Sequence, residues 1–217
     1  MKLNKRRFLI FLSILLIVAG VILLFLRSNQ NAEKTEDIAA ETLQSNLERD
    51  SIFDFDAIEE INPSGILLNS ADENLIIGRL YIPSIELNVT VYNGVTNEIL
   101  NSGVGTMRPN LVMGEGNFPI AGHYSRNKNV LFGDLNSIEL GDLIYLTDNE
   151  KIYEYKVFDT KIVPPTAIEL IEDDVATEHG KPVISLMNCY YVDNQNSGDR
   201  FFVFGELVDV KDYNSDN

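Results

Sequence analysis

The chain has 217 residues, which suits one ordinary domain with an appendage and is short for two full domains. Its formal net charge is −16, and the first 27 residues hold five basic and no acidic side chains, which leaves 12 basic and 33 acidic residues in the remainder. So acidic a remainder excludes nucleic acid as a partner, and solubility accounts for the charge. The single cysteine excludes an internal disulfide, so its thiol is either a small buried group or a reactive one.

An uncharged apolar run opens the chain at residues 8–26, close to the ~20 residues that a helix needs to cross a bilayer. Four basic residues precede the run and one follows it closely, a bias that keeps the N-terminus in the cytoplasm. A cleaved signal peptide is the alternative, but its apolar region usually spans about 7–15 residues and ends at small residues. We therefore predict a cytoplasmic N-terminus at 1–7, a single-pass anchor at 8–26 and an extracellular remainder in the cell membrane.

Residues 27–72 are polar and acidic, and they predict a partly helical extracellular linker. A loose apolar stripe supports a helix that ends before Pro63 and Gly65. The stripe consists of Ile38, Leu43, Leu47 and Ile52. A plain tether is the favoured interpretation, and an amphipathic docking helix is the alternative.

From residue 73 to residue 211 the chain consists of short runs rich in Val, Ile, Tyr and Phe, separated by turn residues. A short helix is expected at 97–102, and residues 212–217 form a polar tail. Many strands with turns between them predict an all-β domain, either a closed barrel or a sandwich. The predicted strands are 76–82, 86–92, 117–122, 143–147, 153–163, 183–189 and 200–208.

The last two predicted strands bring a thiol close to a cation. Cys189 ends the strand 183–189, a polar loop follows at 190–199, and Arg200 begins the next strand. If the two strands pair as a hairpin, the two side chains lie side by side at one end of the sheet. The guanidinium would stabilise the thiolate and donate hydrogen bonds to an oxyanion. His123, directly after the strand 117–122, would move the protons.

Each of these residues also has a purely structural interpretation. Cys189 is equally explained as core filler, Arg200 as a surface residue at a strand start, and His123 as a hydrogen-bonded turn residue. His179 lies in a polar loop before a strand, where a surface position is favoured. The spacing alone leaves both interpretations open.

Three stretches resemble the sortases, and the class A branch of Gram-positive bacteria fits best. They are the run Phe118-Pro119-Ile120-Ala121-Gly122-His123, the run Ser185-Leu186-Met187-Asn188-Cys189, and Arg200 eleven residues later. Further similar runs stand at 78–83, 103–107 and 141–146. The resemblance covers about residues 75–210, the whole predicted β region.

The resemblance implies an eight-stranded closed β-barrel with short helices, preceded by one transmembrane helix. It implies a cysteine transpeptidase that cleaves LPXTG-type sorting signals of surface proteins between Thr and Gly. By this resemblance the thioester on Cys189 would be resolved by an amine of a cell-wall precursor of the lipid II type, with His123 as acid/base. Arg200 would orient the substrate and stabilise the oxyanion, and no cofactor is implied. The residues that match the family's substrate groove are Ala121, Val163, Pro165, Ile168, Leu170 and Met187.

This chain departs from the family pattern in two places. Ser185 and Asn188 stand where the family usually has threonines, which bears on how the substrate is positioned. Some class A members bind calcium before the histidine strand, where this chain has one carboxylate and a later loop adds one more. Two carboxylates are too few for a site that needs about six oxygens, so we expect no metal and activity without calcium. The residues at these places are Arg108, Leu111, Glu115 and Asp173.

Three rival interpretations remain. A pilin-polymerising sortase typically carries a lid and often a second anchor, which the hydrophilic tail disfavours. An L,D-transpeptidase has its arginine almost directly after the cysteine, not eleven residues later. A non-catalytic, tethered wall-binding β-domain would hold Cys189 as a structural residue, and slow alkylation of the thiol would identify it.

Overall fold

The computed structural model describes residues 71–128, 130–193 and 195–213, together with residues 18, 21–22, 41–47, 49 and 51–53. The chain divides into two compact units, 1–39 and 40–217, and the β region belongs to the second. Most of the predicted anchor 8–26, the terminus 1–7, the tail from residue 214 and much of the linker 27–72 lie outside the described residues. Among the residues that are described, no helix is both long and apolar enough to span a bilayer.

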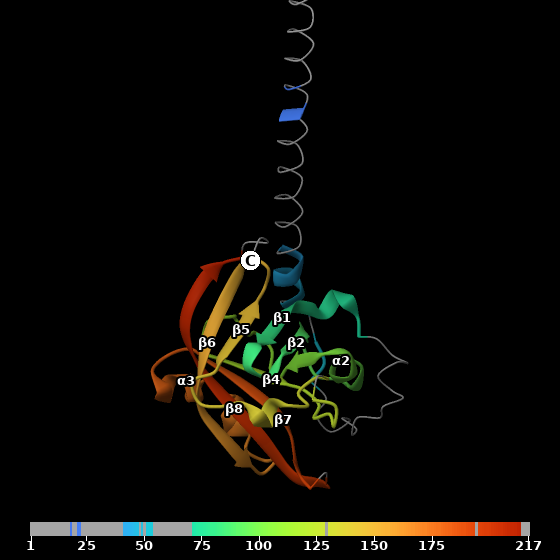
Figure 1. Cartoon of the computed structure of the whole chain (residues 1–217), viewed down its shortest axis with the longest axis vertical. Helices are drawn as coiled ribbons and strands as arrows, with labels where there is room; N and C mark the ends of the chain where they lie inside the picture. Colours follow the sequence, from blue (N-terminus) through green and yellow to red (C-terminus); the bar gives the residue numbers. More distant parts are fainter. Residues whose placement is uncertain are drawn as a thin grey trace, which may run out of the picture. The chain divides into compact units, whose positions relative to one another are not determined.

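Eight strands close into a barrel in the order β1-β2-β3-β4-β7-β8-β6-β5 (Figure 1). This architecture confirms the predicted eight-stranded barrel. Alternating apolar residues build the strands, as in β5, where Ile144 and Leu146 are fully buried between more exposed neighbours. The strands are β1 (Ile76–Ile82), β2 (Leu87–Tyr92), β3 (Val104–Thr106), β4 (Asn117–Ala121), β5 (Leu143–Thr147), β6 (Lys151–Val163), β7 (Val183–Val192) and β8 (Gln195–Asp212).

Two parallel pairings give the barrel its connectivity. β2 runs parallel to β3, β4 runs parallel to β7, and the other neighbours are antiparallel. Because β7 inserts beside β4, the chain after β4 must travel round the barrel through β5 and β6 before it returns. This strand order places β4, β7 and β8 side by side, although 78 residues separate the starts of β4 and β8.

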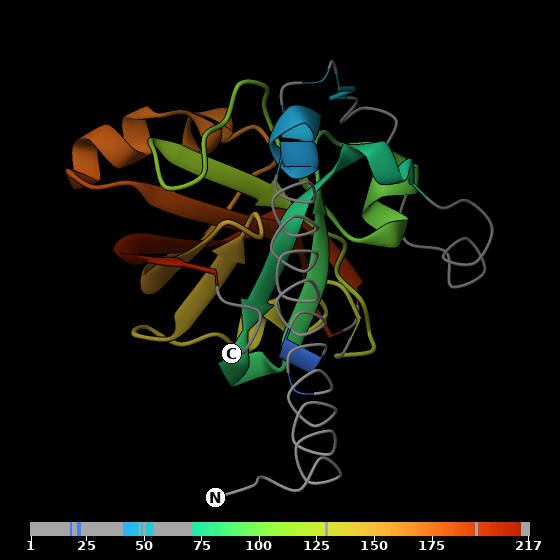
Figure 2. The same cartoon turned by 90° about the horizontal axis from the view of Figure 1, so that it is seen from above.

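Two short helices lie on opposite sides of the barrel, α2 (Asn97–Ser102) and α3 (Asp174–His179) (Figures 1 and 2). The Thr96 hydroxyl caps α2 by accepting a hydrogen bond from the Ile99 N–H at 3.3 Å. Gly180 ends α3 in the left-handed conformation, with φ of 81°. The sequence predicted α2 with the same bounds, whereas α3 was not predicted. Four 3₁₀ turns lie between the strands or flank them: η2 (Glu73–Leu75), η3 (Pro83–Ile85), η4 (Leu135–Ser137) and η5 (Ile168–Ile171).

The two faces of β7 have different roles. Ile184 and Leu186 point into the barrel and are fully buried in its main core cluster. Met187 and Cys189 point outward, where they are half-buried. The outward face of the β4–β7–β8 region therefore offers a surface outside the core, and this surface positions the candidate site.

The hairpin between β7 and β8 differs from its prediction. The predicted loop 190–199 was wrong for most of its length, because β7 continues to Val192 and β8 already begins at Gln195. Val192 pairs with Gln195, and these residues are exposed. The hairpin end projects beyond the core, so polar residues occupy paired positions there without any burial cost.

Residues 41–47 form a helical turn that is fastened to the barrel. The Asn93 side-chain amide donates to the carbonyls of Asn46 and Leu47, at 2.9 and 3.0 Å. The Asn46 amide donates in turn to the Ile76 carbonyl at 2.8 Å. These bonds join residues 46 and 47 to β1 and to the residue that follows β2.

Candidate active site

A groove of about 320 Å³ lies on the outward face of β4, β7 and β8. Its floor is a row of residues across the three strands, because Ala121 pairs with Met187 and Met187 pairs with Phe202. Cys189 pairs with Arg200 in the next row, one repeat of the pleat further on. The pairing that the sequence predicted for Cys189 and Arg200 is thus confirmed.

His123 reaches the same row from β4. The Gly122 N–H donates to the Met187 carbonyl at 3.0 Å, which extends the β4–β7 ladder by one residue beyond Ala121. His123 follows directly, so the ladder carries it to the end of the groove where Cys189 lies. His123, Cys189 and Arg200 all line the groove. The end of β4 and the β7–β8 hairpin, far apart in the sequence, therefore bring the imidazole, the thiol and the guanidinium to one end of one cavity.

The imidazole of His123 is almost completely buried, with 6% of the residue exposed. Burial disfavours the charged ring and lowers the pKa of His123 from its usual 6.5 to about 4. The ring is therefore neutral at neutral pH, and one of its two nitrogens is unprotonated and can accept a proton. Tyr124 stacks on Tyr191 with ring centroids 4.3 Å apart, which ties the residue after His123 to the strand that carries Cys189.

The guanidinium of Arg200 is oriented by its own hairpin. Its Nη1 donates to the carbonyls of Gly198 and Asp199, at 3.2 and 3.1 Å. Because the guanidinium is planar and rigid, two contacts on one nitrogen set the direction of its remaining donors. The side chain of a strand residue is thus held in place before any ligand arrives.

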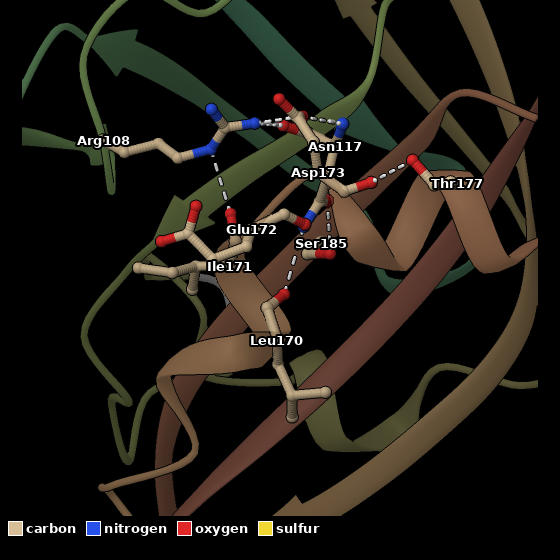
Figure 3. A network of polar contacts seen from close by, with 8 residues as sticks. All are labelled: Arg108, Asn117, Leu170, Ile171, Glu172, Asp173, Thr177 and Ser185. Atoms are coloured by element: carbon tan, nitrogen blue, oxygen red, sulfur yellow. Dashed lines mark hydrogen bonds and ion pairs between the residues drawn. The ribbon is translucent and has the colours of Figure 1, made fainter.

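The connection between β6 and β7 forms one wall of the groove, through Pro164, Pro165, Ala167, Ile168 and Ile171. A buried asparagine at the start of β4 fastens this wall to the barrel. The Asn117 amide donates to the carbonyls of Leu170 and Glu172, at 3.1 and 3.0 Å. The Ser185 hydroxyl donates to the Asn117 Oδ1 at 2.7 Å and fixes the orientation of that amide (Figure 3).

Arg108 adds a second fastening from the segment before β4 (Figure 3). Its Nε donates to the Ile171 carbonyl at 3.0 Å and its Nη2 to the Asn117 carbonyl at 2.9 Å. Arg108 also forms an ion pair with Asp173, whose Oδ1 accepts from the Asn117 N–H at 2.9 Å. The Arg108 guanidinium therefore links the β6–β7 wall to β4, the strand that leads to His123.

Four of the six predicted groove residues line the cavity: Ala121, Pro165, Ile168 and Met187. The other two, Val163 and Leu170, are not among its lining residues. Both pack instead on the apolar cluster beneath α3 that contains Val183 and Phe204. The sequence missed the opposite wall, formed by Val95, Leu100 and Met107, because these apolar residues precede the histidine strand and carry no chemical signal.

The two departures from the family's threonines do not face the groove directly. Ser185 is fully buried and its hydroxyl is used by Asn117. Asn188 is also fully buried, and its Nδ2 donates to the Phe132 carbonyl at 3.0 Å and to the Asn136 Oδ1 at 3.2 Å. Both residues therefore support the frame of the site and not its lining.

Comparison with known proteins shows where this architecture occurs. The sortase domain model matches residues 80–208, more than half of the chain. The chain belongs to the sortase family. It is 36% identical to sortase A of Bacillus anthracis over 213 residues, which cover 96% of this chain and 98% of that protein. It is 32% identical to sortase A of Listeria monocytogenes over 206 residues, which cover 90% of each.

A solved structure supports the same assignment. This sortase superposes on Listeria monocytogenes sortase A with a TM-score of 0.59 at 33% identity, over 65% of this chain and 93% of that one. Membership makes the protein a sortase A-like cysteine transpeptidase. It removes the L,D-transpeptidase and the non-catalytic binding domain from the rival interpretations.

Proposed function

We propose that this sortase cleaves LPXTG-type sorting signals between Thr and Gly and transfers the acyl part to an amine of a lipid II-type cell-wall precursor. The pairing of Cys189 with Arg200, beside His123 at the end of one groove, carries the proposal. It combines a nucleophile, a proton-transfer group and a cationic hydrogen-bond donor at the point where a bound peptide would end.

In the first half-reaction the Cys189 sulfur attacks the carbonyl carbon of the substrate threonine. The thiol proton passes to His123, whose ring is neutral at neutral pH. Arg200 donates from its free edge to the oxyanion of the tetrahedral intermediate. The C–N bond then breaks, the glycine amine leaves with the proton held by His123, and a thioester remains on Cys189.

The second half-reaction repeats these steps with a new nucleophile. The precursor amine attacks the thioester carbonyl and gives a proton to His123. The C–S bond breaks, an amide forms, and the sulfur recovers its proton. The apolar floor and walls exclude water from the thioester and so favour transfer to the amine over hydrolysis.

The groove supports an extended peptide with apolar residues ahead of the scissile bond. Its floor offers Ala121, Met187 and Phe202, and the wall offers Pro165 and Ile168, of which Ile168 is 70% exposed at the rim. Leu and Pro of the motif fit such a surface, since both bury apolar area without a hydrogen-bond requirement.

The apolar run at residues 8–26, with its preceding positive charge, supports a single-pass anchor that leaves the catalytic domain outside the cell. In that arrangement the enzyme meets its substrates as they emerge from the membrane: surface proteins that bear the sorting signal, and the lipid-linked precursor amine.

The test uses the full chain in detergent micelles with a quenched LPXTG peptide and a glycine- or alanine-based amine. Cys189→Ala should abolish cleavage and ligation. His123→Ala and Arg200→Ala should lower kcat by about 100-fold or more each. Arg79→Ala is the matched control, because Arg79 bonds Asn88 on an exposed face of β1. Cleavage that persists in Cys189→Ala would refute the assignment of the nucleophile.

A further inference from the structure

Asn188 is the neighbour of the nucleophile on β7, yet its side chain lies on the other face of the strand. Leu186 and Asn188 are both fully buried inside the barrel, whereas Met187 and Cys189 line the groove. A substrate in the groove therefore has no direct access to the Asn188 amide. Any effect of Asn188 on the reaction must pass through the residues that it holds.

The amide of Asn188 binds the segment that follows His123. Its Nδ2 has two hydrogens and makes two bonds, to the Phe132 carbonyl and to the Asn136 side chain. Phe132 and Asn136 belong to the connection between β4 and β5, which leaves the groove directly after His123. A residue on the nucleophile's strand is thus bonded to the segment of the acid/base.

Phe132 completes the link to His123 in two ways. Its N–H donates to the His123 carbonyl at 3.1 Å. Its fully buried ring packs against Gly122 so closely that a Cβ on this glycine would lie 2.6 Å from a ring carbon. The carbonyl of Phe132 is held by Asn188 while its N–H and ring hold the backbone at 122–123.

We propose that Asn188 is a positioning residue, which sets the separation of His123 from Cys189 through the Phe132 backbone. The inference rests on the proposed catalytic roles of those two residues. It extends the site by three residues that do not line the groove, the buried Phe132 and Asn188 and the exposed Asn136.

Only the donor side of the buried Asn188 amide is paired. Its Oδ1 is buried and accepts no hydrogen bond from any described residue. A leucine of nearly the same shape would remove this unpartnered oxygen. It would also remove the two donors to Phe132 and Asn136 and leave the Phe132 carbonyl without them.

The experiment compares Asn188→Leu and Asn188→Asp with wild type, as full chains in detergent micelles. Peptide cleavage yields kcat and KM, and the pH dependence of Cys189 alkylation by iodoacetamide reports on the thiol–imidazole pair. Asn188→Leu should lower kcat by about 10- to 100-fold, since a small misplacement of a reacting group has effects of this size. Its KM should stay within about twofold, because the groove lining is unchanged, and its alkylation profile should shift along the pH axis.

Asn188→Asp has the same shape and donates a hydrogen bond to Phe132 only while its carboxyl is protonated. Its kcat relative to wild type should therefore fall as pH rises, with the folded fraction followed by circular dichroism. Ile144→Ala, a cavity in the barrel interior on β5, is the control for stability. It should lower the melting temperature while kcat and the alkylation profile stay as in wild type.

Wild-type kcat and an unshifted alkylation profile in Asn188→Leu would overturn the inference and leave the proposed function intact. If that variant does not fold, a pH-independent ratio of Asn188→Asp to wild-type kcat overturns it equally. Activity that survives in Cys189→Ala would instead show that the proposed function itself is wrong.

Discussion

The fastening of the β6–β7 wall by Arg108 yields a quantitative prediction for substrate binding. Arg108→Ala removes the bonds to the Ile171 and Asn117 carbonyls and the ion pair with Asp173. It leaves the floor of the groove and the row of His123, Cys189 and Arg200 untouched. The variant should therefore weaken peptide binding without altering the chemical step.

The expected magnitude follows from the three contacts. A hydrogen bond from a charged donor contributes about 1.5–3 kcal/mol, and the half-buried position of Arg108 places its two at the low end. The side chain of Asp173 is 59% exposed, so its ion pair adds only about 0–1 kcal/mol. A total loss of about 3 kcal/mol corresponds to about 150-fold in the equilibrium between docked and undocked wall.

The bonds of Asn117 to the wall remain in the variant and keep part of the docked population. Because the apparent affinity scales with the fraction of binding-competent protein, KM for the peptide should rise, by at most about 150-fold if the wall becomes almost wholly undocked. The assay is initial-rate cleavage of a quenched LPXTG peptide, with kcat expected to stay within about twofold. Arg108→Lys keeps the charge but lacks the planar guanidinium. Its KM should lie between those of wild type and Arg108→Ala.

Arg79→Ala serves again as the matched control, since it removes an arginine with two hydrogen bonds to one partner on an exposed strand face. Its KM should equal that of wild type. An unchanged KM in Arg108→Ala would refute the argument that these contacts hold the wall. So would a fall of kcat as large as the rise of KM, because it would place Arg108 in the chemical step.

The remaining predictions concern calcium, acid stability and packing. Peptide cleavage should proceed at the same rate in calcium and in EDTA, because the Arg108 guanidinium already pairs with Asp173, and a clear calcium requirement would contradict this. Protonation of buried His123 is resisted down to pH about 4 but occurs near 6.5 in the unfolded chain, so folding free energy is lost as pH falls from 6.5 to 4. His123→Asn should remove up to about 3 kcal/mol of this loss, measured by urea titrations at several pH values. If the variant lost as much folding free energy in acid as wild type, the burial of His123 would not be the cause. Gly122→Ala should lower the free energy of unfolding by about 1–3 kcal/mol in the same titrations, because the new Cβ displaces the Phe132 ring. A urea midpoint equal to that of wild type would show that the ring moves without cost.

Much of the barrel could be predicted from local pattern. The bounds of β1 and β5 match their predictions, because each is a short run of β-forming residues between clear turn signals. β3 was missed since three residues are too few to show a period of two. α3 was missed for a similar reason, as six residues with one buried side chain have no helical stripe.

The part of the candidate site that lies on the β7–β8 hairpin could be predicted from the sequence. Cys189 and Arg200 end and begin adjacent strands, so antiparallel pairing alone brings them together. His123 reaches them only because β7 inserts in parallel beside β4. The residue motifs suggested this arrangement through the family resemblance, and no periodicity in the chain encodes it.

The sequence by itself determined most of the strands, the all-β class and the three chemically distinctive residues, because periodicity and residue type are local properties. Only the tertiary structure decided what surrounds them. Arg108 and Asp173 are 65 residues apart, and Asn188 meets Phe132 across 56. Such contacts exist only once the barrel has closed, since closure decides which face of each strand is interior and which loops become neighbours. That is why the support of the site, unlike its chemistry, could not be read from the order of residues.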